Sequence, residues 1–188
     1  AVLGNIDVET LSVVAENIAS TTDAVIRVGN ATLDAPDGVV DLGQSENQVD
    51  TIDLLRTDVA TLDLAAAVLL DEVNVTSLTV RTDSDVSQAP GESVIDVSGL
   101  AQILAPGANV SLAEFGGTVN VGRYDVEAAT FTLDEASAVT LERLDAGQAD
   151  ITAAGAIAST APLTQPLTED VIRNSDPVEP ARNLQALV

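Results

Sequence analysis

The sequence repeats itself at two distances, and no other feature limits the possible folds as strongly. Leu11-Ser12-Val13 returns as Leu78-Thr79-Val80, and Arg56-Thr57-Asp58-Val59 returns as Arg123-Tyr124-Asp125-Val126, each 67 positions later. A third copy begins near Asp150, so the long unit spans about 67–71 residues. The 188 residues therefore hold two such units and part of a third.

A shorter period lies inside the long unit. Leu11, Leu33, Leu54 and Val75 are separated by 22, 21 and 21 residues. Apolar and polar residues alternate around these positions, as in Val73-Asn74-Val75, and this alternation is typical of a strand with one buried face. Turn-forming pairs lie between such segments at Gly29-Asn30, Asp37-Gly38, Pro90-Gly91, Pro106-Gly107 and Gly116-Gly117. This pattern predicts an all-β parallel β-solenoid with about 21 residues per turn, in which each turn stacks on the one before.

One segment also fits a helix. Apolar residues between Ile52 and Val73 recur at spacings of three and four, and Leu64–Leu70 is rich in helix-forming residues. The corresponding segment of the second unit, residues 118–141, favours strands because it contains Val119-Asn120-Val121 and Thr130-Phe131-Thr132. Because two copies of one repeat should share a structure, we predict strands in both.

The composition argues against several classes of function. The chain has no Cys, Met, Trp, His or Lys, which removes thiol chemistry, imidazole bases, Schiff-base lysines and zinc sites built from His or Cys. Its net charge of −23 repels nucleic acid and anionic membrane surfaces. The central apolar run Leu64–Leu70 is far shorter than the roughly 20 residues of a membrane span. We predict no nucleic-acid partner, no membrane insertion and, because the connections are too short to wall a substrate groove, no enzymatic activity.

The charge also predicts an interaction with cations. Residues 1–160 contain 26 acids and five arginines. Seven to eight turns stacked at about 4.8 Å would form a rod of roughly 37 Å, with about one net negative charge every 1.8 Å. Such a rod must condense cations, so calcium, magnesium or high salt should favour its stability or assembly.

Three stretches of the second half resemble a known family. They are Ala113–Val121, Phe131–Leu141 and Ile151–Ile157, and they look like successive filamentous-haemagglutinin-type repeats of large secreted bacterial exoproteins and adhesins. The resemblance covers about residues 109–160 and reaches the first half through the internal repeat. It implies a right-handed parallel β-helix in an extracellular or cell-surface bacterial protein, adhesive or structural, with no catalytic residues.

Acidic residues are the only abundant reactive groups. Asp83 and Asp85, two positions apart, and the adjacent Asp134 and Glu135 are the weak candidates for a metal site, which would bind calcium or another divalent cation loosely. A solvated turn is the simpler interpretation of the first pair, since isolated acid pairs are common in a chain with 30 acids. No other cofactor is predicted.

Arg56 and Arg123 occupy corresponding places in the long repeat. Each precedes an acid by two residues, Asp58 and Asp125 respectively. We therefore expect a lateral ion pair at each place, one that adjusts surface charge more than it stabilises the fold.

The last residues depart from the repeat, which divides the chain into a solenoid, residues 1–160, and a C-terminal segment, residues 161–188. Four prolines interrupt strand pairing there. Leu184, Leu187 and Val188 form an apolar face on a predicted short helix, which we expect to cap the solenoid or to dock on a neighbouring subunit for self-association.

The sequence thus predicts a non-catalytic structural or adhesive rod. It would be a stalk segment of an adhesin, in contact with neighbouring β-helix segments, or a subunit that stacks end to end into a fibre. The alternative is a carbohydrate-binding or carbohydrate-active β-helix that uses an acidic lateral face, with calcium, to contact cell-surface or matrix glycans. The chain starts without Met or a signal-type segment, so we expect a processed polypeptide or part of a longer one.

Overall fold

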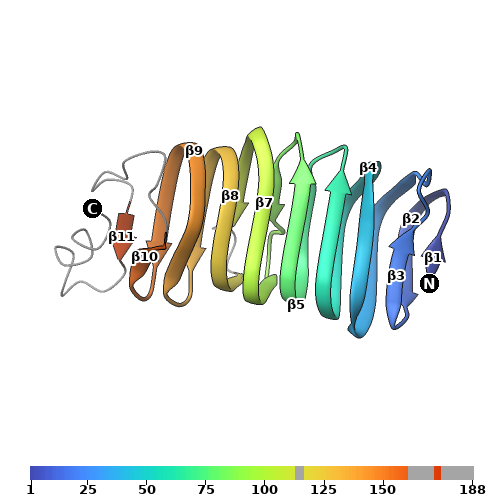
Figure 1. Ribbon diagram of the computed structural model, residues 1–188, viewed down its shortest axis with the longest axis horizontal. Coiled ribbons are helices and arrows are strands. Elements are labelled where there is room, and N and C mark those ends of the chain that lie inside the picture. Colours follow the sequence, from blue (N-terminus) through green and yellow to red (C-terminus); the bar gives the residue numbers. More distant parts are fainter. Residues whose placement is uncertain (113–116, 161–171, 175–188) are drawn as a thin grey trace.

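The chain winds into an elongated parallel β-solenoid, with the first residues at one end of the rod (Figure 1). The computed structural model describes residues 1–112, 117–160 and 172–174. Every element in these ranges is a strand. The strands are β1 (Val2–Leu3), β2 (Ile6–Val14), β3 (Asn17–Ser20), β4 (Ile26–Leu64), β5 (Val68–Thr82), β6 (Val86–Gln88), β7 (Val94–Leu112), β8 (Thr118–Glu135), β9 (Val139–Ala153), β10 (Ile157–Ser159) and β11 (Ile172–Asn174).

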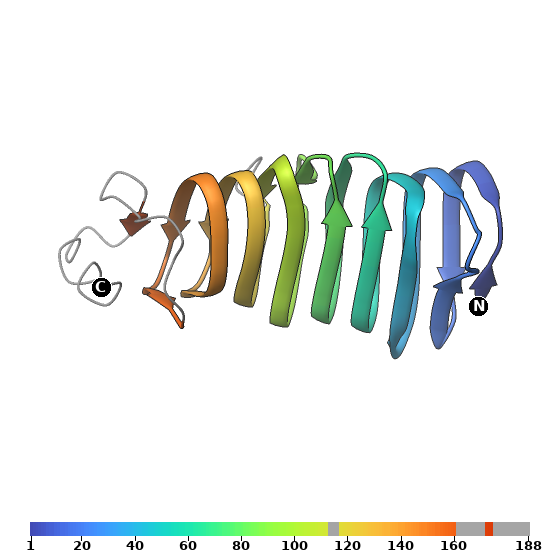
Figure 2. The ribbon, with the colours of Figure 1, turned by 45° about the horizontal axis from the view of Figure 1, so that its top comes forward.

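All strand pairings between these elements are parallel, and they join residues that lie one turn apart. The step between stacked partners varies along the rod: it is short from Tyr124 to Leu141 and long from Ile95 to Val119. About eight turns of roughly 20 residues result. The long elements, such as β4 with 39 residues, continue around the corners of the solenoid (Figure 2). The predicted all-β parallel solenoid is confirmed.

Aliphatic side chains fill the bore of the solenoid in columns that run along its axis. One column, which we call the axial column, passes from turn to turn through positions that pair directly or follow a paired residue. Its members are Ile52, Leu70, Gln88, Leu112, Leu133 and Ile151. Because side chains of a strand alternate between its two faces, a column of this kind fills the bore and leaves the intervening polar residues outside.

Strand structure prevails in the segment that also fitted a helix. β4 continues to Leu64 and β5 begins at Val68, with a bend between them. Buried and partly exposed residues alternate from Ala60 to Leu64, and Val68 and Leu70 point into the core. The two-residue period therefore decides the structure, because each strand finds partners on the turns above and below it.

The predicted turn pairs differ in backbone conformation. Asp37 has a φ of 54°, Gly91 of 113° and Gly107 of 79°, so these three residues adopt the left-handed conformation that a tight corner requires. Gly29-Asn30 lies within β4, as Asp37-Gly38 does, but has no positive φ.

The long period of the sequence is not the structural spacing. Ala60 stacks on Leu78, Leu78 on Ala101 and Ala101 on Tyr124. Three turns later, the residue equivalent to Ala60 is therefore Tyr124, which comes earlier in the sequence than the repeat of 67 positions predicts. The prediction that Arg56 and Arg123 are equivalent is therefore wrong, because turns of different length shift one repeat against the next.

Candidate functional site

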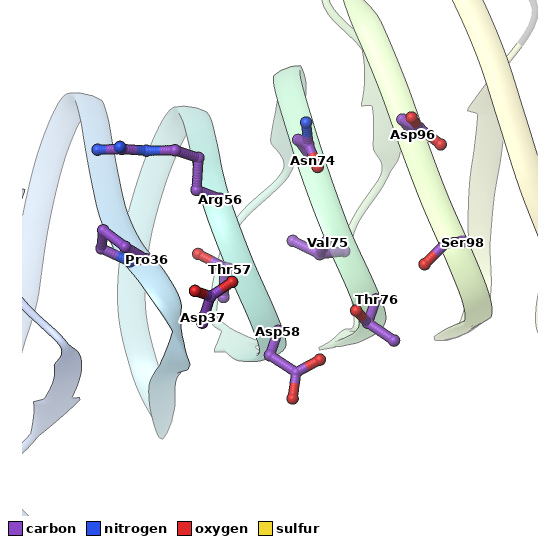
Figure 3. Close-up of a pocket in the computed structure, with 10 residues that line it drawn as sticks. All are labelled: Pro36, Asp37, Arg56, Thr57, Asp58, Asn74, Val75, Thr76, Asp96 and Ser98. Carbon is purple, nitrogen blue, oxygen red and sulfur yellow. The ribbon is translucent and has the colours of Figure 1, made fainter.

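A lateral groove crosses four successive turns near the middle of the solenoid (Figure 3). It is an open groove of about 490 Å³. We define the lateral groove by the residues that line it, which are Pro36, Asp37, Arg56, Thr57, Asp58, Asn74, Val75, Thr76, Asp96 and Ser98. Most of these side chains are polar and project outward from neighbouring turns, so the groove presents hydroxyl, amide and carboxylate groups in one place.

Two residues of the groove have an unusual backbone. Asp37 and Arg56, with φ of 54° and 51°, are the only non-glycine residues with positive φ in the described parts of the chain. For side chains other than Gly this conformation costs free energy, and it persists only where the surrounding structure fixes it. It allows the chain to turn sharply on two consecutive turns and so places both side chains at the groove.

Arg56 is held by an acid on the preceding turn. Its Nε donates a hydrogen bond to Oδ1 of Asp34 at 3.0 Å, and its Nη2 donates to Oδ2 of the same carboxylate. This two-point contact raises the pKa of the Arg56 guanidinium, with a smaller contribution from Asp37. Because Asp34 already neutralises Arg56, the acids Asp37, Asp58 and Asp96 leave the groove negatively charged.

Several groove side chains are free to bind something else. Within the described residues, the side chains of Asp58, Asn74 and Thr76 make no hydrogen bond, whereas Asp96 accepts one from Asn120 Nδ2 at 3.1 Å. The groove can therefore hydrogen-bond polar or cationic groups. No set of three or more His, Cys, Asp or Glu residues in the described ranges could hold a metal ion.

A second polar cluster lies inside the bore. Glu135, 1% exposed, accepts hydrogen bonds from the Tyr124 hydroxyl, from Ser137 Oγ at 3.0 Å and from the Val121 N–H at 3.2 Å. Burial raises the pKa of Glu135 above 4.5, although these hydrogen bonds oppose the shift, and burial also raises the pKa of Tyr124 well above 10.0. The Glu135 carboxylate thus accepts the hydrogen bond of the Val121 N–H next to the short turn that runs from Tyr124 to Leu141.

The structure separates the predicted acid pairs from each other and from the groove. Asp83 and Asp85 are exposed in the turn between β5 and β6, and Asp85 Oδ1 accepts hydrogen bonds from the Asn109 N–H at 2.8 Å and Nδ2 at 3.1 Å. Asp134 is exposed and Glu135 is buried, so these neighbours point to opposite faces of β8. Loose calcium binding stays a prediction. The predicted self-association residues Leu184, Leu187 and Val188 lie outside the described residues.

The sequence analysis missed the buried role of Glu135. Phe131 and Leu133 point into the bore, and Glu135 continues their two-residue alternation. The alternation therefore contained the signal, but we considered Glu135 only together with Asp134, as a weak candidate for a metal site.

The predicted ion-pair partners are wrong. Arg56 pairs with Asp34 instead of Asp58, and Arg123 pairs with Glu142 instead of Asp125. Asp125 pairs with Arg143 at 2.6 Å. These pairs connect neighbouring turns because residues in register on adjacent turns are closer than outward residues along one strand.

Comparisons with known proteins agree with the fold and name no function. The chain is a β-solenoid repeat protein. Its residues 57–122 match a family described as repeats of unknown function (DUF5649). No curated protein and no solved structure matches the chain. In the described parts of the chain, no helix is long and apolar enough to cross a membrane.

The matched region corresponds to whole turns. Thr57 stacks on Val75, Val75 on Val97 and Val97 on Val121. The match therefore begins at one position of the solenoid and ends one residue after the same position three turns later.

Proposed function

We propose that the chain is a non-catalytic structural rod of a secreted or surface-displayed bacterial protein. The observation that supports this proposal is the continuous bore. The axial column continues from turn to turn, and nearly every member is an aliphatic residue. Such a core forms an extended body of adjustable length, and a solenoid of this kind can separate two functional parts by a distance set by the number of turns.

The surface supports the same proposal. The outward positions of the strands carry most of the acids, and the net charge of −23 keeps rods apart laterally. The extracellular location is part of the proposal and is what the resemblance to bacterial exoprotein repeats implies. Lack of Cys is compatible with it, since a long aliphatic core needs no disulfides.

The location can be tested on intact cells of the source organism. An antibody to the chain should label the outer surface in immunoelectron microscopy, and external protease should remove the label. Label found only in the cytoplasm would contradict the proposal.

The rod can be tested separately by changing its length. Deletion of residues 57–120 joins Arg56 to Val121, which occupies the position of Thr57 three turns later. The shortened chain should fold and lose about 14 Å of its longest dimension in small-angle X-ray scattering. Deletion of residues 57–110 is the control. It joins Arg56 to Ser111, which lies between the two successive equivalents of Thr57, Val97 and Val121, so the turns lose their register and folding should be disrupted. Equal behaviour of the two deletions would argue against independent stacked turns.

The lateral groove favours a second candidate function, the binding of glycans. Free carboxylate, amide and hydroxyl groups of Asp58, Asn74 and Thr76 are suited to hydrogen bonds with sugar hydroxyls. A glycan array with and without calcium tests this candidate. Selective binding that Asp58→Asn with Asn74→Ala abolishes would support it, whereas an array without selective binding would reject it.

A further inference from the structure

The lateral groove has a regular floor and two polar walls. Its floor contains the inward residues Thr57 and Val75, which stack in register on successive turns and are each 3% exposed. Because strand residues alternate between two faces, the residue before and the residue after each floor position point outward. The walls are therefore two rows of outward side chains that run along the axis of the rod (Figure 3).

We call these walls the first row and the second row. The first row consists of Arg56, Asn74 and Asp96, and the second row consists of Asp58, Thr76 and Ser98. Each row takes one residue from each of three successive turns, so its members recur at the turn spacing of about 4.8 Å. Arg56 points away from Asn74 (Figure 3) and binds Asp34 on the preceding turn. It therefore leaves the space between the two rows open.

The rows present polar groups that no described residue occupies. The side chains of Asp58, Asn74 and Thr76 make no hydrogen bond within the described parts of the chain. A carboxylate only accepts hydrogen bonds, whereas an amide and a hydroxyl group both accept and donate them. A hydroxyl group that donates to a carboxylate forms a charge-assisted bond, which is stronger than a neutral one. The groove is therefore suited to a ligand that carries many hydroxyl groups.

The spacing of the rows distinguishes between two classes of extended ligand. In an extended peptide, side chains on the same side are about 6.6 Å apart, so a peptide along the axis loses register with the rows within a few turns. In an extended glycan, each pyranose ring advances the chain by nearly the turn spacing. Successive sugars can therefore present their hydroxyl groups to equivalent positions of successive turns, which favours a glycan over a peptide.

We propose that the lateral groove binds a linear, neutral glycan that lies along the axis of the rod, with one sugar to each turn. The inference rests on the glycan-binding candidate above and names its ligand class. Because the groove crosses four turns, four consecutive sugars fill it. Acidic glycans are excluded by charge, since Asp37, Asp58 and Asp96 line the groove and the net charge of the chain is −23.

Isothermal titration calorimetry of the full chain tests the proposal. The probes are neutral β-1,4-linked oligosaccharides of glucose, of mannose and of N-acetylglucosamine, each from two to six sugars long. In at least one series, affinity should rise about tenfold or more from two sugars to four and then level off, because each added sugar gains hydrogen bonds until the groove is full. No binding in any series, or an affinity that does not depend on length, would overturn the proposal.

Two sets of control sugars test the shape and the charge of the ligand. Oligosaccharides of α-1,4-linked glucose coil instead of extending, so they should bind about tenfold or more weakly than the β-linked series that binds. The binding series with its primary hydroxyl groups oxidised to carboxylates should lose its affinity. Equal binding by the coiled or by the oxidised chains would overturn the linear, neutral ligand.

Two variants locate the contact, one in each row. Thr76→Val removes a hydroxyl group and keeps a β-branched side chain, and Asn74→Ala removes the amide of the opposite row. Each should weaken the binding of four sugars about fivefold. The matched control is Thr79→Val, because Thr79 lies on the same strand, β5, is partly exposed and does not line the groove. Equal weakening by Thr76→Val and Thr79→Val would overturn the assignment.

Circular dichroism checks that each variant keeps its β-sheet signal, and Asn74→Ala decides the question if Thr76→Val does not fold. The glycan array separates this inference from the candidate function on which it rests. Selective binding of branched or acidic glycans alone would support the candidate and overturn the linear, neutral ligand, whereas an array without selective binding would reject both. The proposed rod is tested independently by the length of the chain that lacks residues 57–120.

Discussion

The buried contact between Tyr124 and Glu135 should stabilise the solenoid by an amount that depends on pH. Tyr124 is fully buried and its hydroxyl donates to Oε2 of Glu135, while the hydrogen bonds from Val121 and from Ser137 Oγ end on Oε1. Tyr124→Phe removes this one donor and keeps the ring. A hydrogen bond to a charged group contributes about 1.5–3 kcal/mol, so at pH 8 we expect the variant to lose roughly 2 kcal/mol of unfolding free energy.

The loss should be smaller at pH 4. Burial raises the pKa of Glu135 in the folded protein above 4.5, so the folded state binds this proton more tightly than the unfolded state. The contribution of this carboxyl to stability therefore increases as the pH falls through its folded pKa, and it is complete below 4.5. A protonated Glu135 makes only a neutral hydrogen bond with Tyr124, so the cost of Tyr124→Phe should fall to about 1 kcal/mol.

Urea denaturation at pH 8 and pH 4 measures both values. Leu133→Ala is the control, because Leu133 is buried on the same strand and stacks between Leu112 and Ile151. It should lose about 2–5 kcal/mol equally at both pH values. Subtraction of the control removes the general effect of pH on a strongly acidic chain. If Tyr124→Phe lost the same free energy at both pH values, the assignment of an ionised buried Glu135 would be refuted.

Three further predictions concern other parts of the rod. Asn47→Ala should lower the unfolding free energy by about 2–4 kcal/mol in urea denaturation. The buried Asn47 side chain accepts a hydrogen bond from the Ile26 N–H at 3.0 Å and donates one to the Leu42 carbonyl, so the variant leaves both partners unsatisfied. A loss below about 0.5 kcal/mol would contradict this reasoning. Gly38→Ala should strongly lower the melting temperature, because its Cβ would overlap the Glu16 carbonyl oxygen, whereas Gly4→Ala, with open space around the added carbon, should change it little. The melting temperature should rise with NaCl and with calcium, since cations screen the acids; thermal unfolding that is unchanged by salt and by chelator would contradict the charge argument.

The sequence predicted the fold because two independent signals agreed. Alternation such as Val119-Asn120-Val121 identified strands with one buried face, and the recurrence near 21 residues identified stacked turns. Both signals come from the bore, where most turns place aliphatic side chains at equivalent positions. The turn length could not be read in the same way, because corners admit insertions without loss of core contacts. The step from Ile95 to Val119 is accordingly longer than the step from Tyr124 to Leu141.

The candidate site was less accessible to sequence reasoning. The lateral groove brings together residues of four turns, and its formation depends on left-handed conformations at Asp37 and Arg56. No local pattern identifies Arg56 as such a residue. The ion-pair partners were predicted wrongly for a related reason. Asp34 and Arg56 lie on neighbouring turns, so their pairing can be predicted only when the register between the two turns is known.

The aliphatic bore and the acidic surface have opposite effects on the rod. Each added turn buries apolar side chains and so stabilises its neighbours, but it also adds acids to a surface that carries about one net charge per 1.8 Å at a turn spacing of about 4.8 Å. Burial is local and almost independent of salt, whereas the repulsion extends over about a Debye length and weakens as salt rises. Because the two effects respond differently to salt, added salt should stabilise the rod without changing which side chains form its core.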